Sequence, residues 1–177
     1  FVRNLVERYD GDGIDDMPEL KGAANHFQLS EEWPTVWTPA HEAKTEAEFN
    51  KAVKDYVELL KYTSEAAKQV NPNAKIATAG LTSGYRFLVY ADGYITDPDG
   101  GLRRGIHYTP SQIKASDIDY QYNDAIRYII QNGGNYFDIF TIHAFEEKDT
   151  FLEGKIKWLK DRFKEYGTDR MMKSMGY

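Results

Sequence analysis

The stretch NPNAKIATAGL, residues 71–81, joins a helix to a strand and indicates the class of fold. In the preceding segment, which opens with Thr45, apolar side chains recur every three or four residues and predict an amphipathic helix. The NPN sequence is a stop signal for this helix. The short apolar run that follows, residues 74–81, is typical of a strand. The stretch therefore predicts a helix that leads directly into a strand.

The same alternation continues on both sides of this stretch. Further helices are predicted at residues 1–9, about 116–131 and from Thr150 to the stop at Gly167, and further strands at residues 25–30, 136–145 and, weakly, 170–175. Regular alternation at this spacing indicates βα units and a parallel sheet. Thr45 with Glu48, and Thr150 with Glu153, have the spacing of capping boxes that start two of these helices.

Four strands cannot close a (β/α)8 barrel, which needs about 250 residues. A free four-stranded piece would also expose two sheet edges. The sequence of 177 residues therefore predicts an α/β fold, a partial (β/α)8 barrel of about four βα units in one domain spanning residues 1–177. We expect this domain to be cut from a longer chain at both ends, or to be completed by another copy or by a missing half.

Composition narrows the classes of partner. The net charge of −6 argues against nucleic acid or an anionic membrane surface as the main partner. No apolar run is long enough to predict a membrane span. Without cysteine there is neither a disulfide nor a thiolate nucleophile. His26, His41 and His107 have no partners at ligand spacing and no nucleotide motif is present, so we expect neither a catalytic metal nor a cofactor.

A long connection, residues 82–115, follows the strand at 74–81 and is rich in tyrosine. Long loops after strands are where parallel α/β proteins build ligand contacts. Tyr85, at the start of this connection, is thus a candidate substrate contact. Arg103 and Arg104 are either solvated or able to reach an acidic sugar.

The segment HFQLSEEW, residues 26–33, carries two adjacent glutamates. Side chains alternate faces along a strand, so Gln28 and Glu32 share one face while Phe27 and Leu29 pack under the helices. Glu32 then points inward at the carboxyl end of its strand, next to Trp33, which is a setting that suits a general acid. The alternative is that both glutamates are solvated residues before a loop.

Three segments, taken in order, resemble the clan A glycoside hydrolases, in particular the cellulase-like and β-xylosidase-like members. They are RNLVERYDGDGIDDMPELKGAANHFQLSEEW, KQVNPNAKIATAGL and YFDIFTIHAF. The resemblance implies strands 4 to 7 of a (β/α)8 barrel, and a retaining hydrolase of β-linked sugars that acts on an oligosaccharide or polysaccharide outside the cytoplasm.

Carried over by position, the resemblance implies roles for particular residues. Glu32 matches the acid/base glutamate and His143 matches a histidine near the reaction centre. Glu31 stands where the family usually has the asparagine that binds the sugar 2-hydroxyl. Trp33 replaces the usual proline, and Phe145 replaces a common tyrosine. All three replacements would lie in the substrate-binding region.

Two further features stay open. Trp33 and Trp37 would either stack on a sugar ring or cover the barrel mouth. A retaining mechanism needs a second carboxylate about 5–5.5 Å from the first. Residues 170–177, which resemble strand 7, contain no Asp or Glu. The nucleophile therefore lies outside this sequence, or the chain is a non-catalytic carbohydrate-binding or structural half-barrel.

The acidic loop YDGDGIDDM, residues 9–17, departs from the EF-hand pattern. Counted from Asp10, the fifth position is Ile14 and the twelfth is Lys21, where an EF-hand requires acidic or amide ligands. A polar Gly-Asp turn is the preferred interpretation, with a stray calcium site as the alternative.

Overall fold

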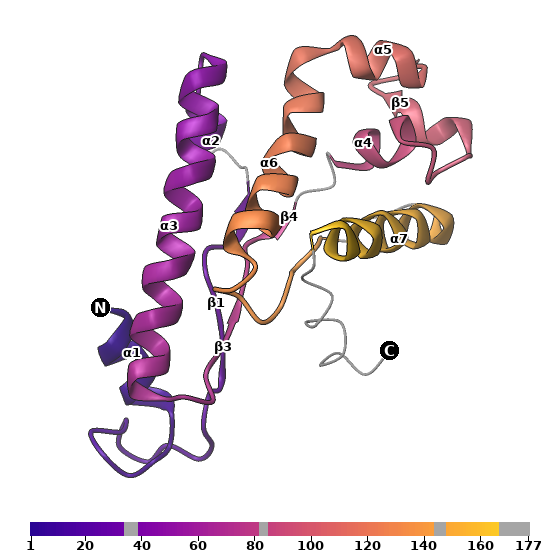
Figure 1. Ribbon diagram of the computed structural model, residues 1–177. Coiled ribbons are helices and arrows are strands. Elements are labelled where there is room, and N and C mark those ends of the chain that lie inside the picture. Colours follow the sequence, from indigo (N-terminus) through magenta and orange to yellow (C-terminus); the bar gives the residue numbers. More distant parts are fainter. Residues whose placement is uncertain (34–38, 82–84, 144–147, 167–177) are drawn as a thin grey trace. The chain divides into compact units, whose positions relative to one another are not determined.

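The computed structural model describes residues 1–33, 39–81, 85–143 and 148–166 (Figure 1). Its class is mixed α/β, as the sequence predicts. The single domain that we expected divides into two compact units. The first consists of residues 1–80 and 132–141, and the second of residues 81–131 and 142–177. Each unit is described on its own. The described strands do not form a closed barrel.

The first unit has a small parallel sheet at its centre. Its helices and strands are α1 (Val2–Tyr9), β1 (His26–Gln28), β2 (Glu32–Trp33), α2 (Pro39–Glu42), α3 (Glu46–Val70) and β3 (Lys75–Ala77), with β4 (Gly80–Leu81) at its boundary. β1 and β3 pair in parallel, with Phe27 opposite Ile76 (Figure 1). A parallel bridge from Ala77 to Ile139 adds a third segment next to β3. The three segments are thus spatial neighbours in the order in which they occur along the chain.

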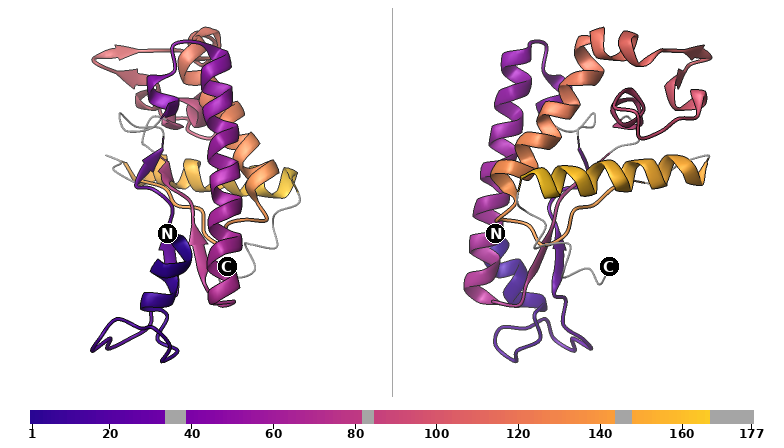
Figure 2. Two further views of the ribbon diagram at one scale, coloured as in Figure 1. Left: turned by 90° about the vertical axis from the view of Figure 1, so that its left-hand side faces the viewer. Right: turned by 45° about the vertical axis from the view of Figure 1, so that its right-hand side comes forward.

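The predicted helix after Thr45 is confirmed as α3. Thr45 Oγ1 accepts a hydrogen bond of 3.2 Å from the backbone N–H of Glu48, and the Glu48 carboxylate accepts one of 2.8 Å from the N–H of Lys44. The N-terminal cap is therefore formed, with its return bond one residue earlier than the capping-box pattern predicts. Along one face of α3, side chains from Phe49 to Ala67 are buried. α1 packs against α3 (Figure 2). The Arg3 guanidinium donates a hydrogen bond to the Gln69 side chain.

Replacing Thr45 with alanine is expected to lower the free energy of unfolding by about 1 kcal/mol. The reason is that the N–H of Glu48 loses its acceptor at the uncapped end of a 25-residue helix. Urea denaturation followed by circular dichroism would measure the change. Thr45→Ser is the matched control, because it keeps the hydroxyl. Equal stability of the alanine and serine variants would contradict this role for the cap.

Asp138 fixes the third segment to β3. Its carboxylate accepts a hydrogen bond of 3.0 Å from the N–H of Ile76, and it forms ion pairs with Lys68 at 3.2 Å and Lys75 at 3.6 Å. Over its described part, residues 136–143, the strand that we predicted at residues 136–145 is wrong as a continuous strand. At Ile139 it forms the isolated bridge to Ala77. The hydrogen bond and ion pairs of Asp138 hold this segment against β3, where a continuous strand would have formed more backbone hydrogen bonds.

The second unit is mostly helical. It contains α4 (Arg86–Ala91), the 3-10 helix η2 (Pro98–Gly101), a hairpin of β5 (Leu102–Arg103) and β6 (Ile106–His107), α5 (Pro110–Ala115), α7 (Asp149–Glu165) and most of α6 (Asp117–Gly133). The prediction of one long loop at 82–115 is therefore wrong over the described part, residues 85–115. α5 starts with a complete capping box between Thr109 and Gln112. The hairpin turns at Arg104 and Gly105, both at positive φ, as a tight two-residue turn requires.

The predicted helices at 116–131 and from Thr150 are confirmed as α6 and α7, but the second predicted capping box is wrong. α7 begins at Asp149 with Lys148 as its N-cap residue, and this cap has no side-chain hydrogen bond. Thr150 therefore lies inside the first turn. Trp158 and Phe151 are fully buried on the inner face of α7. No helix among the described residues combines the length and apolar character that a membrane span needs.

Candidate functional site

Backbone hydrogen bonds tie together the carboxyl ends of the strands in the first unit. The N–H of Leu29 donates to Ala77 O at 2.9 Å, and the N–H of Gly80 donates to Glu31 O at 2.7 Å. On the other side of β3, the N–H of Thr141 donates to Thr78 Oγ1 at 3.0 Å. The segment with the two glutamates is thereby held at the carboxyl end of the sheet, where parallel α/β enzymes carry catalytic side chains.

A turn at Ser30 separates β1 from the two glutamates. Ser30 has a φ of +68°, and the Gln28 side chain donates to Ser30 O at 2.9 Å across the turn. The period-two alternation therefore does not continue from β1 to Glu32, and the strand predicted at 25–30 is shorter than expected. The order of exposure nevertheless agrees with the expected choice, because Glu32 is half-buried in β2 while Glu31 is exposed.

Trp33 is a core residue of the first unit. It is 3% exposed and packs between Phe49, at 6.2 Å, and Tyr56, at 5.8 Å, measured between ring centroids. An indole in this position cannot stack on a sugar ring without leaving the core. Trp33 thus packs against α3, whereas the sequence left open that it stacks on a sugar ring or covers the mouth of a barrel. Trp37 lies outside the described residues.

Tyr56 positions the chain just after β3, a role that sequence reasoning missed. Its phenolic oxygen accepts a hydrogen bond of 2.8 Å from the N–H of Ala79. Burial raises the pKa of Tyr56 to about 12, so its hydroxyl stays protonated at neutral pH. The available signal was a tyrosine on the buried face of a predicted amphipathic helix, since a buried hydroxyl requires a partner.

Replacing Tyr56 with phenylalanine is expected to destabilise the protein by about 1–3 kcal/mol, since the N–H of Ala79 loses its partner in a buried place. Chemical denaturation would measure the loss. Tyr62→Phe is the control, because Tyr62 is an exposed tyrosine of the same helix. A loss no larger than that of the control would contradict this role for the hydroxyl.

The other predicted site residues do not join Glu32 in the first unit. His143 is half-buried and belongs to the second unit, and Phe145 lies outside the described residues. Tyr85 is 3% exposed and lies in the core of the second unit, where its ring centroid is 6.3 Å from that of Trp158. We expected Tyr85 to contact substrate, but in the structure its side chain is buried.

A group of buried cationic and polar side chains surrounds Tyr85. Lys155 is fully buried, with Nζ 4.7 Å from the centre of the Tyr85 ring. Burial, with a smaller contribution from the neighbouring Arg86 guanidinium, lowers the pKa of Lys155 to about 8. Among the described residues, Tyr85 Oη and Arg86 Nε are buried without a hydrogen-bond partner. Sequence reasoning missed this group, because Lys155 interrupts an otherwise apolar helix face.

The acidic loop after α1 brings three carboxylates together. Ligand atoms of Asp10, Asp12 and Asp16 lie within 4.8 Å of one another. Asp16 accepts hydrogen bonds from the N–H groups of Gly11 and Gly13, at 3.0 and 2.8 Å, and Asp12 accepts one from Ile14 at 2.8 Å. The acidic side chains thus accept backbone hydrogen bonds that shape the loop, as a polar Gly-Asp turn would require.

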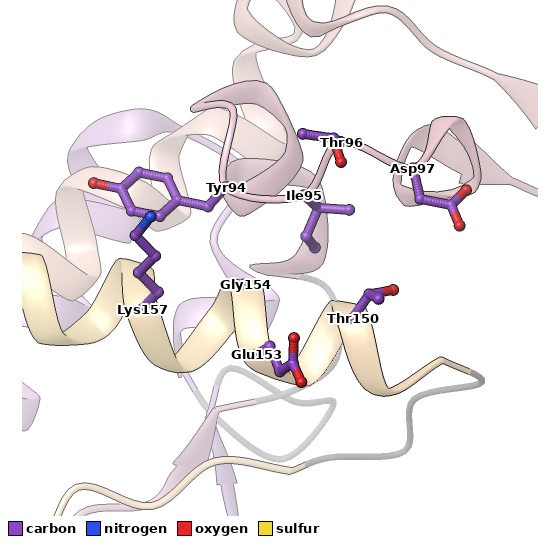
Figure 3. Close-up of a pocket in the computed structure, with 8 residues that line it drawn as sticks. All are labelled: Tyr94, Ile95, Thr96, Asp97, Thr150, Glu153, Gly154 and Lys157. Atoms are coloured by element: carbon purple, nitrogen blue, oxygen red, sulfur yellow. The ribbon is translucent and has the colours of Figure 1, made fainter.

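An open pocket of about 440 Å³ lies in the second unit (Figure 3). One wall is the segment 94–97 that follows α4, and the other is the first half of α7. Gly154 allows the two walls to meet, because a Cβ there would be 2.7 Å from both Ile95 Cγ1 and Tyr94 O. No sequence motif predicts this pocket, since its two walls, at 94–97 and 150–157, are far apart along the chain.

Comparison with protein-family models, with curated proteins and with solved structures found no match for this chain.

Proposed function

We propose that this chain is part of a (β/α)8 glycoside hydrolase that cleaves β-linked sugars with retention of configuration. The observation that supports this most is the sheet of the first unit. β1, β3 and the segment at Ile139 are parallel and adjacent in chain order. Consecutive βα units of a barrel have this order, and so does either half of a doubly wound sheet, which reverses its strand order only at a switch point. Partial (β/α)8 architecture is thus part of the proposal.

In this mechanism Glu32 is the general acid and base. Its carboxyl group donates a proton to the oxygen of the glycosidic bond as that bond breaks. In the second step the resulting carboxylate takes a proton from the water that releases the sugar. Glu32 lies in β2, beyond the carboxyl end of β1, and its side chain is half-buried. Both observations support this role. His143 is proposed as a neighbour of the reaction centre, and Glu31 as a contact of the sugar.

The nucleophile has to come from elsewhere. Residues 170–177 contain no Asp or Glu, although the resemblance aligns them with the strand that carries this group. Because the covalent step requires a carboxylate, the proposal assigns it to a residue outside this sequence. An oligosaccharide or polysaccharide is the proposed partner, and pairing with the missing half of the barrel would complete the site.

The test is hydrolysis of a panel of 4-nitrophenyl β-glycosides by the natural chain, with the first-formed anomer identified by proton NMR. We expect release of nitrophenol with the β-anomer formed first. Formation of the α-anomer first would contradict retention, and absence of turnover on the whole panel would contradict the hydrolase.

The second candidate function is carbohydrate binding without catalysis. Two observations favour it: residues 170–177 contain no Asp or Glu, and the carboxylate of Glu31 stands where the resemblance expects an amide. Calorimetric titration with β-linked oligosaccharides discriminates the two functions. Binding without turnover would support the second candidate, and measurable turnover would exclude it.

A further inference from the structure

The turn between β1 and β2 changes which of the two adjacent glutamates is buried. Phe27 and Leu29 are half-buried, so continued alternation along the strand would place Glu31 on their side. Instead Glu31 is exposed and Glu32 is half-buried. The change occurs at Ser30, whose φ of +68° lies in the left-handed region. A side chain makes this region costly, so the surrounding structure has to hold the turn.

The side-chain amide of Gln28 spans this turn. Its Nε2 donates to Ser30 O at 2.9 Å and to Glu31 O at 3.3 Å. Glu31 O also accepts a hydrogen bond of 2.7 Å from the N–H of Gly80, at the start of β4. One residue of β1 thus holds both carbonyl groups of the turn, and β4 holds the second of them as well.

The chemistry of this contact requires an amide. The NH2 group of glutamine has two N–H donors, one for each carbonyl oxygen, whereas a methionine side chain of similar length has none. Gln28 is exposed. Its contribution therefore comes from these hydrogen bonds and not from packing in the core.

We propose that Gln28 is a positioning residue, whose amide fixes the turn at Ser30 and thereby places the carboxyl group of Glu32, rather than that of Glu31, in the site. Gln28 acts through the backbone of residues 30 and 31 and not by contact with the substrate. The use of Glu32 as an acid rests on the proposed function. The control of the turn by Gln28 rests on the hydrogen bonds and on the order of exposure.

The first test is amide hydrogen exchange of the natural chain, which reports on the turn whether or not the chain hydrolyses sugars. Gln28→Met should raise the exchange rate of the Gly80 N–H about threefold to tenfold, because its acceptor, Glu31 O, is held less firmly. The N–H of Leu29, which is bonded before the turn, should exchange as in the unmodified chain. Gln131→Met, at an exposed glutamine of α6, is the control and should change neither rate.

A second substitution tests whether the turn itself is what Gln28 holds. Ser30→Gly, added to Gln28→Met, should restore slow exchange of Gly80, because glycine adopts a positive φ without the cost of a side chain. Arg104→Gly is the matched control. Arg104 has a φ of +50° in the hairpin of the second unit, so the same change of backbone freedom is made away from this turn. It should not restore the exchange rate.

The second test compares kcat/KM of the natural chain on an unactivated β-glycoside and on a 4-nitrophenyl β-glycoside. Gln28→Met should lower the first about threefold to tenfold and leave the second nearly unchanged, because only the unactivated substrate needs a placed proton donor. Adding Ser30→Gly should restore the first value. A merely structural role for Gln28 would lower both values alike.

Unchanged exchange at Gly80, or no restoration by Ser30→Gly, would overturn the proposal. Faster exchange with an equal loss on both substrates would also overturn it, because Gln28 would then stabilise the fold without placing Glu32. If the unmodified chain turns over neither substrate, the proposed function fails. The exchange rates then decide on their own whether Gln28 holds the turn.

Discussion

Replacing Glu32 with glutamine is expected to lower kcat on an unactivated β-glycoside by about 10²–10⁴-fold. Glutamine keeps the size and most of the packing of the side chain but cannot donate a proton to the leaving oxygen. The loss of kcat/KM should be much smaller on a 4-nitrophenyl glycoside, because kcat/KM reports the first step and this leaving group departs without protonation. Initial rates on both kinds of substrate, measured with the natural chain, check this difference.

Two companion variants make the result specific. Glu58→Gln removes one negative charge from an exposed position of α3 and should leave both rates unchanged. Glu31→Gln tests the assignment of the neighbouring glutamates. If Glu31→Gln loses activity on the unactivated substrate while Glu32→Gln retains it, the roles of the two residues are reversed. Equal rates for all the variants would remove the acid/base role from this segment.

Replacing Lys155 with methionine is expected to raise the free energy of unfolding at neutral pH by about 2–3 kcal/mol. Burial, with Arg86 as the second cause, lowers the pKa of Lys155 from 10.5 to about 8. Keeping the ammonium charged inside the fold therefore costs free energy that the unfolded chain does not incur. Methionine has a similar length and fills the space without a charge.

The sign of the pH dependence follows from the same shift. Between pH 8 and 10.5 the unfolded chain binds more protons at Lys155 than the folded chain, so the unmodified protein gains stability as the pH rises through this window. Below pH 8 the cost is fully present. Lys155→Met should lack this contribution, so its advantage should shrink toward pH 10.5. Urea denaturation across this range, with Lys164→Met as an exposed control, measures both effects.

A lower stability of Lys155→Met at neutral pH would contradict the prediction. It would show that the ammonium contributes more through its contacts than its burial costs. The ring of Tyr85, 4.7 Å from Nζ, is one such contact. Comparing Lys155→Met with Tyr85→Leu and the double variant would then measure the coupling between the two side chains.

Long periodic helices could be predicted from the sequence because their signal is repeated over many residues. α3, α6 and α7 all follow segments with apolar side chains at helical spacing. The short elements of the second unit carry no such repeat. Their signals are single residues, such as Thr109 and Gln112 at the start of α5 and Gly105 in the hairpin turn. A tyrosine-rich connection therefore looked unstructured although it contains helices and a hairpin.

The candidate site was predictable only where local chemistry decides it. The choice of Glu32 over Glu31 agrees with the exposure of the two side chains, but the alternation argument behind it fails at Ser30. The burial of Trp33 depends on Phe49 and Tyr56, which lie on α3 and share no local pattern with it. Contacts between segments far apart in sequence, like those between the two walls of the pocket, cannot be predicted from the spacing of residues along the chain.

The first unit is discontinuous along the chain, and this affects how the protein is made. Its residues 1–80 are joined by residues 132–141 only after the intervening 81–131 segment. During synthesis, β1 and β3 leave the ribosome well before their neighbour at Ile139. Until then one side of β3 has no strand beside it, and an uncovered strand edge invites association with other chains. A nascent chain stalled before residue 132 should therefore need a chaperone, and one released after residue 141 should need it less.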